Sequence, residues 1–356
     1  MTARPRLLTT IAATIALALA ATASSLAVAA PASASRAHAL GVAAYGNDIS
    51  WPQCPSSQGG YDLPGPTPGA SFAVLGLTDG GSFRANPCIG RAVRAVKGRH
   101  LWAGAYAIST YPTRAELARY GGTGTMAERL RRTGAAQAEF NLATMARVGL
   151  RSPMVWIDVE PRTRSPWSAH TAKNNAVIDG VIARYKAAGV RAGIYSYDKA
   201  WKKITGGRAL PGVAAWVPVG HTGRAGAAAR CAVPSFDGTK PMLTQWTDGV
   251  RDFNLTCPGV TGQAARGNLL TPYLNVHLAS GSHGDAVLML QQRLGAPKPD
   301  GVFRPTTRAR VIALQRAHHL TANGMAGSAE WRALGAGTGT YTPPVPGFMD
   351  ALFAST

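Results

Sequence analysis

Eight short apolar segments between residues 43 and 257 constrain the fold more than any other feature of the sequence. Six of them are expected to be buried strands, at residues 72–78, 101–109, 154–160, 191–197, 214–219 and 242–246. Weaker strand candidates stand at the two ends, at 45–50 and 250–254. The stretches 126–150 and 171–190 have apolar residues at helical spacing. Strands that alternate with helices predict an α/β domain built on a parallel sheet.

The last part of this region has a different composition. Beyond residue 200 the chain contains long loops rich in Gly, Pro and Arg and leaves little room for helices. We therefore expect a barrel whose last strands are joined by loops.

The N-terminus, residues 1–34, has the layout of a secretory signal peptide. Arg4 and Arg6 precede an apolar stretch that runs to about Ala30, and the small residues 32–34 follow. A transmembrane anchor is the alternative, but the Ala-x-Ala pattern favours cleavage. The mature protein is then expected to be a secreted monomer, extracellular or associated with the cell wall, with no membrane contact after signal cleavage.

Four cysteines all lie before residue 258, at Cys54, Cys88, Cys231 and Cys257. Outside the cytoplasm an even number favours disulfides, for which three connectivities are open. The pairs Cys54 with Cys88 and Cys231 with Cys257 are preferred because they close short loops between neighbouring elements. A zinc site is the alternative, but the CxxC and HExxH spacings are missing. We expect no metal and no cofactor.

The charge of the chain is strongly positive. Its 37 Lys and Arg against 17 Asp and Glu give a formal net charge of +20. Such a surface attracts polyanions. For an exported protein an anionic cell-wall polymer is a better candidate than nucleic acid, because no basic recognition motif accompanies the charge. A general effect on solubility is the alternative.

Two of the scarce acids, Asp158 and Glu160, end the strand at 154–160. Side chains alternate along a strand, so both point the same way, into the mouth of a sheet or barrel. Their repulsion raises the proton affinity of at least one of them. A carboxylic acid that stays protonated near neutral pH can protonate a leaving glycosidic oxygen. The alternative is that both acids cap the next turn or pair with an arginine such as Arg162.

Two further acids stand in the outermost strand candidates, Asp48 in the first and Asp252 in the last. A single Asp at such a place is usually a turn or cap residue. If the sheet closes, however, both face the same mouth as Asp158 and Glu160. Four acids on the first, central and last strands predict an active site.

At this point the chain resembles glycoside hydrolase family 25, the Chalaropsis-type lysozymes. The resemblance covers residues 43–257 in order and rests on an Asp-x-Ser strand, GAY (104–106), the strand ending in Asp-x-Glu, GIYSY (193–197), AAWVPV (214–219) and TQWTDG with DFN (244–254). It implies an α/β fold, a flattened (β/α)5β3 barrel of the TIM type, in which five βα units precede three strands.

The same resemblance implies roles for the acids. Glu160 matches the proton donor, Asp158 the partner that orients or stabilises the reacting sugar, and Asp48 and Asp252 the acids that flank the cleft. The implied reaction is cleavage of the β-1,4 bond between N-acetylmuramic acid and N-acetylglucosamine in peptidoglycan. Retaining, inverting and substrate-assisted mechanisms all remain open. Asp79, in LTDGGSF, keeps the acid that the family has near the end of its second strand.

Aromatic residues in these strands are candidates for stacking on sugar rings. We predict this role for Tyr106, Tyr195 and Trp246, which lie in the strands that carry the resemblance. Ordinary core packing is the alternative for each of them.

The sequence also departs from the family pattern. WPQCP, residues 51–55, follows the Asp-x-Ser motif where the family commonly has His and Trp. Insertions at 58–70 and 220–240 are expected to reshape the cleft.

Beyond the barrel we expect a linker, a small all-α unit and a flexible tail, at residues 258–275, 276–335 and 336–356. Residues 285–294 and 306–320 read as amphipathic helices and 329–334 as a short third one. The unit resembles the three-helix peptidoglycan-binding domain, on Gly-x-x-Gly before V-x-x-L-Q-x-x-L, then Asp-Gly-x-Phe and a final Trp-x-x-Leu. The resemblance implies that peptidoglycan is its ligand; a small helical bundle of unknown partner is the alternative.

Together these features predict a secreted peptidoglycan hydrolase of the lysozyme type. One alternative is a catalytically silent wall-binding protein that keeps the barrel as a scaffold, because a fold alone does not fix a function. Another is a glycosidase that acts on a different polysaccharide. The Asp158 and Glu160 pair argues against the first alternative, and the helical unit argues against the second.

Overall fold

The computed structural model describes residues 43–258, 261–263, 268, 270–337 and 345–346. The predicted signal peptide, residues 1–34, lies outside this part of the chain, as do most of the tail and part of the linker.

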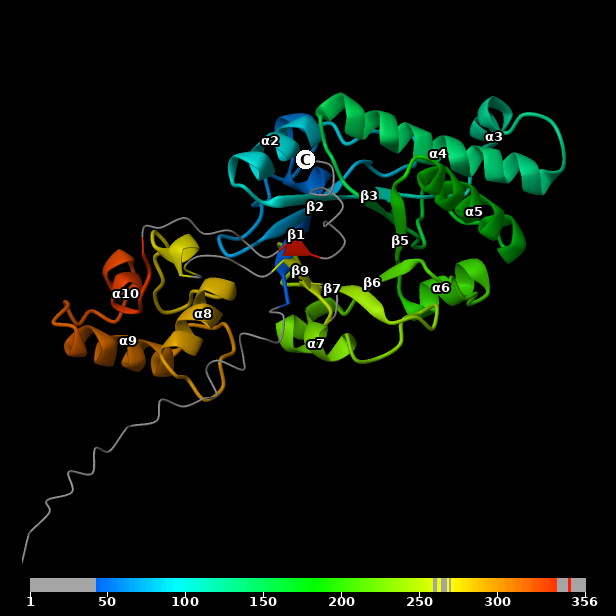
Figure 1. Cartoon of the computed structure of the whole chain (residues 1–356). Coiled ribbons are helices and arrows are strands. Elements are labelled where there is room, and N and C mark those ends of the chain that lie inside the picture. The colour runs from blue at the N-terminus through cyan, green and yellow to red at the C-terminus, as the bar shows by residue number, and fades with distance from the viewer. Residues whose placement is uncertain (1–42, 259–260, 264–267, 269, 338–344, 347–356) are drawn as a thin grey trace, which may run out of the picture. The chain divides into compact units, whose positions relative to one another are not determined.

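Eight strands close into a barrel in chain order, β1 to β8 (Figure 1). They span Tyr45–Ile49, Phe72–Gly76, Trp102–Ile108, Met154–Asp158, Arg191–Tyr195, Ala214–Pro218, Pro241–Thr247 and Asp252–Thr256. Strands β1 to β7 run parallel to their neighbours, whereas β8 is antiparallel to both β7 and β1 and closes the barrel between them. All eight predicted strands are confirmed, and so is the mixed α/β barrel.

Helices follow the strands from β2 to β6 and pack on the outside of the barrel (Figure 1). They are α2 (Ile89–Gly98), α3 (Arg114–Tyr120), α4 (Met126–Val148), α5 (Thr171–Ala187), α6 (Asp198–Thr205) and α7 (Gly223–Arg230). Short 3-10 turns occur at Trp51–Gln53, Ser56–Gln58, Gly220–Thr222 and Thr271–Tyr273. The expectation of little helix beyond residue 200 is wrong for α7, because its Ala-rich sequence favours helix without an apolar period.

The barrel interior is filled by large apolar side chains. Phe72, Trp156, Trp216 and Leu243 form one buried cluster inside it. Trp156 requires a glycine beside it, since a Cβ on Gly193 would lie 2.3 Å from Cε3 of its indole. The barrel interior is therefore a packed core and not a channel.

Helices α4 and α5 approach each other through two glycines. A Cβ on Gly134 would lie 2.1 Å from the carbonyl oxygen of Val177, and one on Gly180 would lie 2.0 Å from that of Arg131. Both glycines are buried. The two helix backbones are therefore in direct contact, with no room for a side chain between them.

The structure contains two disulfides within its described part. Cys54 pairs with Cys88, with a Cα–Cα distance of 5.7 Å, and Cys231 pairs with Cys257 at 5.3 Å. Both preferred pairings are confirmed. The first ties the loop after β1 to the start of α2, and the second ties the end of α7 to the end of β8.

The second disulfide should contribute substantially to stability. Replacing Cys231 and Cys257 together by serine is expected to lower the free energy of unfolding by about 3 kcal/mol, because the unfolded chain gains freedom when a loop of this length is released. Urea unfolding, with the intact first disulfide verified by mass spectrometry, measures the change. An unchanged midpoint would show that the native bond contributes nothing net.

The C-terminal residues form α8 (Asp285–Arg293), α9 (Pro305–Ala317) and α10 (Ser328–Ala333), where the sequence predicts helices. Leu290, Phe303, Val311 and Trp331 are buried in their common core. Two short strands, β9 (Thr261–Gln263) and β10 (Val345–Pro346), pair antiparallel.

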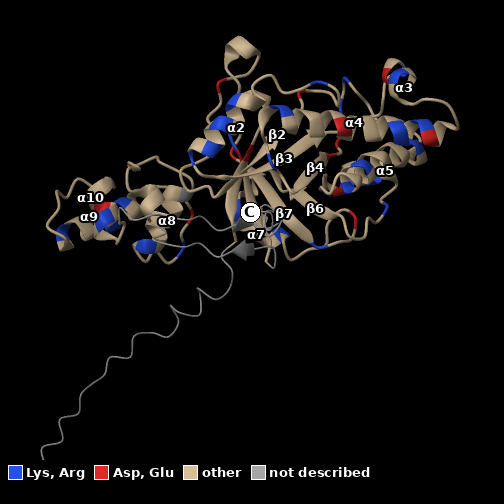
Figure 2. Cartoon of the chain, turned by 45° about the horizontal axis from the view of Figure 1, so that its top comes forward, with Lys and Arg blue, Asp and Glu red and all other residues tan. Residues whose placement is uncertain are grey.

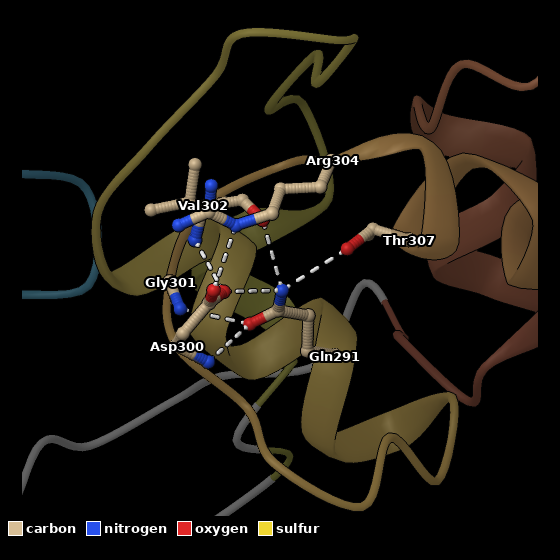
Figure 3. A network of polar contacts seen from close by, with 6 residues as sticks. All are labelled: Gln291, Asp300, Gly301, Val302, Arg304 and Thr307. Atoms are coloured by element: carbon tan, nitrogen blue, oxygen red, sulfur yellow. Dashed lines mark hydrogen bonds and ion pairs between the residues drawn. The ribbon is translucent and has the colours of Figure 1, made fainter.

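A buried glutamine, Gln291, organises the turn between α8 and α9 (Figure 3). Its Nε2 donates to the Asp300 carboxylate at 2.9 Å, to the Val302 carbonyl at 3.0 Å and to the Thr307 hydroxyl at 3.0 Å. Its Oε1 accepts from the backbone N–H groups of Asp300 and Gly301. The side chain thus contacts all of these groups at once, with its two N–H protons shared among three acceptors.

Gln315 repeats this arrangement between α9 and α10. Its Nε2 donates to Asn323 Oδ1, to the Met325 carbonyl and to Glu330 Oε1, and its Oε1 accepts from the Gly324 N–H. Asn323 stands where the first turn has an aspartate. The helical unit is therefore built from two equivalent helix-and-turn halves.

Lys and Arg residues are spread over the outer helices (Figure 2). On α2, for example, Arg91, Arg94 and Lys97 are all exposed. None of the helices in the described part of the chain combines the length and apolar character of a bilayer span.

Candidate active site

A pocket of about 420 Å³ lies where the carboxyl ends of the parallel strands meet. It is lined by Asp48, Tyr106, Asp158, Glu160, Arg162, Tyr195, Trp216, Pro218, Gly220, Gln245, Trp246, Thr247 and Asp252. The structure thus brings together the four predicted acids and the three predicted aromatic residues.

Strand register explains why the acids converge. Asp158 is the last residue of β4 and is aligned with Tyr195 on β5, which is in turn aligned with Trp216 on β6. Glu160 follows two residues later, beyond the end of the strand, and still lines the pocket. The alternation of side chains that predicted a common direction for the two acids therefore holds here.

Asp48 and Asp252 are directly opposite each other across the closing pair of strands, β1 and β8. Gln245 Nε2 and Asn254 Nδ2 both donate to Asp48 Oδ1, at 2.9 and 2.7 Å. Burial, reinforced by the charge of Asp252 and opposed by the two amide donors, raises the pKa of Asp48 to about 7. Burial raises the pKa of Asp252 as well. The pair is therefore arranged to hold a proton near neutral pH.

Asp158 is nearly buried and uses one oxygen to bind Arg162, whose guanidinium lies 2.5 Å from Oδ2. Burial raises its pKa, and the arginine opposes the rise. The other oxygen, Oδ1, has no hydrogen-bond partner among the residues that the structure describes, and neither does Nε1 of Trp216. Because both residues line the pocket, we expect these two buried polar atoms to bind a ligand.

Glu160 has the environment of a general acid. Burial, with added repulsion from Asp158 and Asp252, raises its pKa to about 7, although Arg162 opposes the rise. Its backbone carbonyl accepts a hydrogen bond of 3.0 Å from Trp167 Nε1, which fixes the loop after β4. A substantial fraction of this carboxyl is therefore protonated at neutral pH.

The three predicted aromatic residues differ in how their rings pack. Tyr195 and Tyr106 contact Trp216 edge to face, with ring centroids at 4.6 and 5.9 Å. Trp246 instead stacks on Phe253 at 5.2 Å, with an interplanar angle of 12°. One face of its indole is thus occupied by the protein.

Asp79 is the one predicted site residue outside this pocket lining. Its carboxylate pairs with Arg84, at 3.1 Å. A contact between Asp79 and a longer substrate stays a prediction.

Sequence reasoning missed the residues that hold Asp48. Gln245 lies two positions after the buried Leu243 and two before the pocket residue Thr247 on β7, and Asn254 follows Asp252 by two positions on β8. The period of two was the available signal, because it places an amide on the same face as a predicted acid. Trp216 also lines the pocket, and its only sequence signal is its position in the apolar strand AAWVPV.

The raised pKa of Asp48 has a consequence for stability. The folded state holds this proton up to about pH 7, whereas the unfolded chain releases it near the ordinary value of 3.8, so the free energy of unfolding falls as pH rises from 4 to 7. Asp48→Asn is expected to stabilise the protein by about 4 kcal/mol at pH 8 and hardly at all at pH 4. Urea unfolding at both pH values measures this. An equal stabilisation at pH 4 and pH 8 would show that the ionisation of Asp48 is not its cause.

Comparison with known proteins finds matches to both parts of the chain. Residues 113–217, which include Asp158 and Glu160, match the family described as "Lysozyme-like protein 1", and residues 283–334 match "Putative peptidoglycan binding domain". "Lysozyme-like protein 5" of Caenorhabditis elegans is 32% identical over 74 residues, which are 21% of this chain. The match spans about a third of that relative, 33% of its length.

Solved structures similar to the chain include two lysozymes. A family GH25 lysozyme from Aspergillus fumigatus is 16% identical with a TM-score of 0.43, over 61% of this chain and 96% of that one. The bacterial lysozyme from Streptomyces coelicolor is 20% identical with a TM-score of 0.41, over 60% and 91%.

Proposed function

We propose that this chain, which carries a lysozyme-like region and a peptidoglycan-binding domain, is a glycoside hydrolase of the bacterial cell wall. It cleaves the β-1,4 bond between N-acetylmuramic acid and N-acetylglucosamine in peptidoglycan. The observation that carries the proposal is Glu160, a carboxyl with its pKa raised to about 7, in one pocket with three more acids.

The roles of the acids follow from their surroundings. Glu160 donates its proton to the leaving glycosidic oxygen, and a water molecule completes the hydrolysis at the anomeric carbon. Asp158, fixed by Arg162, presents its free oxygen to the reacting sugar. Asp48 and Asp252 add negative charge near the positive charge that develops on the sugar ring.

The two parts of the chain have complementary tasks in this proposal. Residues 43–257 form the catalytic barrel, and residues 276–335 bind the wall and raise the local concentration of the substrate. The match of residues 283–334 to a peptidoglycan-binding family supports the second task. After removal of residues 1–34 the enzyme acts outside the cytoplasm, where both disulfides are stable.

Digestion of purified peptidoglycan tests the proposal. The mature protein is incubated with cell-wall sacculi, and the new reducing ends are identified by mass spectrometry after borohydride reduction. We expect reduced N-acetylmuramic acid at the new ends. Reduced N-acetylglucosamine would assign the cut to the other bond, and sedimentation with the wall without new ends would favour a silent binding protein.

A further inference from the structure

The loop between β1 and β2 presents an aromatic pair to solvent. The ring centroids of Trp51 and Tyr61 are 4.8 Å apart, with an interplanar angle of 58°. Tyr61 is 66% exposed, so much of its ring is open to solvent. The loop contains the WPQCP motif and part of the insertion at 58–70, the places where the sequence departs from the lysozyme pattern.

This loop is held in one conformation by several bonds. The Tyr61 and Leu63 N–H groups both donate to the Pro52 carbonyl, at 3.0 and 3.3 Å, and the Asp62 N–H donates to the Cys54 carbonyl at 3.1 Å. The disulfide from Cys54 fastens the loop to α2. An exposed aromatic side chain on a fixed loop loses little conformational entropy when it binds a ligand.

The loop continues the catalytic pocket. A smaller pocket of about 120 Å³ is lined on one side by Asp48, Thr247 and Asp252, which also line the catalytic pocket. Pro52 and Leu63 of the loop line its other side. The loop thus adjoins the catalytic pocket through the residues that the two pockets share.

The charged residues of the loop indicate which class of ligand it can bind. Residues 51–63 contain one acidic residue, Asp62, and no Lys or Arg. The loop has no cation for the carboxylates of a peptide or for a polyanion, whereas a pyranose ring offers apolar C–H groups that pack on an aromatic face.

We propose that the loop at residues 51–63 is an outer sugar-binding subsite, at which Tyr61 packs on a sugar of the same glycan strand that occupies the catalytic pocket. This inference rests on the proposed function. The subsite gives the enzyme a preference for long glycan strands over short fragments.

Glycan oligomers of defined length test the subsite. kcat/KM is measured on peptidoglycan oligomers of four and of eight sugars for the native protein, Tyr61→Ala, Tyr61→Phe and the control Met126→Ala, whose side chain is exposed at the start of α4. Tyr61→Ala is expected to reduce the preference for the longer oligomer about tenfold. Tyr61→Phe and Met126→Ala should retain the native preference.

The outcomes of this experiment distinguish a failure of the proposed subsite from a failure of the proposed reaction. If the native protein cleaves both oligomers and Tyr61→Ala keeps the native preference, the subsite is wrong and the proposed function stands. If the native protein cleaves neither, the reaction is wrong; calorimetric titration with the eight-sugar oligomer then decides the subsite, since Tyr61→Ala must weaken binding about tenfold for it to survive.

Discussion

Glu160→Gln is expected to lower kcat/KM on peptidoglycan by about 10³-fold while the fold and its stability are kept. Glutamine has nearly the same shape as glutamate but no acidic proton, and general acid catalysis contributes roughly 10²-fold to 10⁴-fold. The replacement also removes a partly buried carboxyl whose charge is unfavourable there, so the folded state should not be weakened. Release of reducing ends measures the activity, and circular dichroism the fold.

Glu139→Gln is the matched control. Glu139 is an exposed glutamate on α4 that pairs with Arg184, so its replacement should leave kcat/KM unchanged. In the native protein kcat/KM should fall as pH rises through about 7, because Glu160 then loses the proton that it must donate. Near-native activity in Glu160→Gln would remove this residue from the reaction and leave another carboxyl of the pocket as the acid.

Gly180→Ala is expected to lower the free energy of unfolding by about 3 kcal/mol, although alanine is the better helix former. The added methyl group would lie 2.0 Å from the Arg131 carbonyl oxygen, and backbone atoms cannot move aside as a flexible side chain does. Helix α5 would have to shift away from α4, which loses contacts along both helices.

Gly98 provides the comparison for this change. It is the last residue of α2, and a Cβ there would meet nothing within 4 Å. Gly98→Ala should therefore stabilise the protein slightly, through helix propensity and a less flexible unfolded chain. Urea unfolding of both variants measures whether each substitution raises or lowers the free energy of unfolding. Stabilisation by both would mean that α4 and α5 can separate at little cost.

Strands were predictable here because a strand that is buried on both faces is apolar along its whole length. A segment such as FAVLG, residues 72–76, is apolar throughout, as expected of a parallel strand between an interior and a helical layer. Helix α7 has no comparable pattern, since GRAGAAAR contains no apolar period. Its burial depends on contact with β7, whose Thr244 donates to the Ala227 carbonyl. That contact spans distant residues and cannot be derived from either segment alone.

The same contrast between local sequence pattern and contacts between distant residues applies to the candidate site. Asp158 and Glu160 are two positions apart, so local geometry alone predicts that they point together. The meeting of Asp48 with Asp252 requires that the sheet close, which depends on pairing between the first and last strands and not on local pattern. The packing of Tyr61 on Trp51 lies still further from local rules, because it depends on how a disulfide-bonded loop folds back on itself.

The pairing of β1 with β8 also determines at which stage of folding the pocket is complete. The hydrogen bond from Asn254 to Asp48 joins residues 206 positions apart, and contacts of this kind form late because a long loop must close first. A chain that ends before β8 has neither Asp252 nor Asn254, one of the two amides that hold Asp48. Pairing of the last strand with the first therefore completes the site, since it adds Asp252 to the pocket and the Asn254 amide to Asp48.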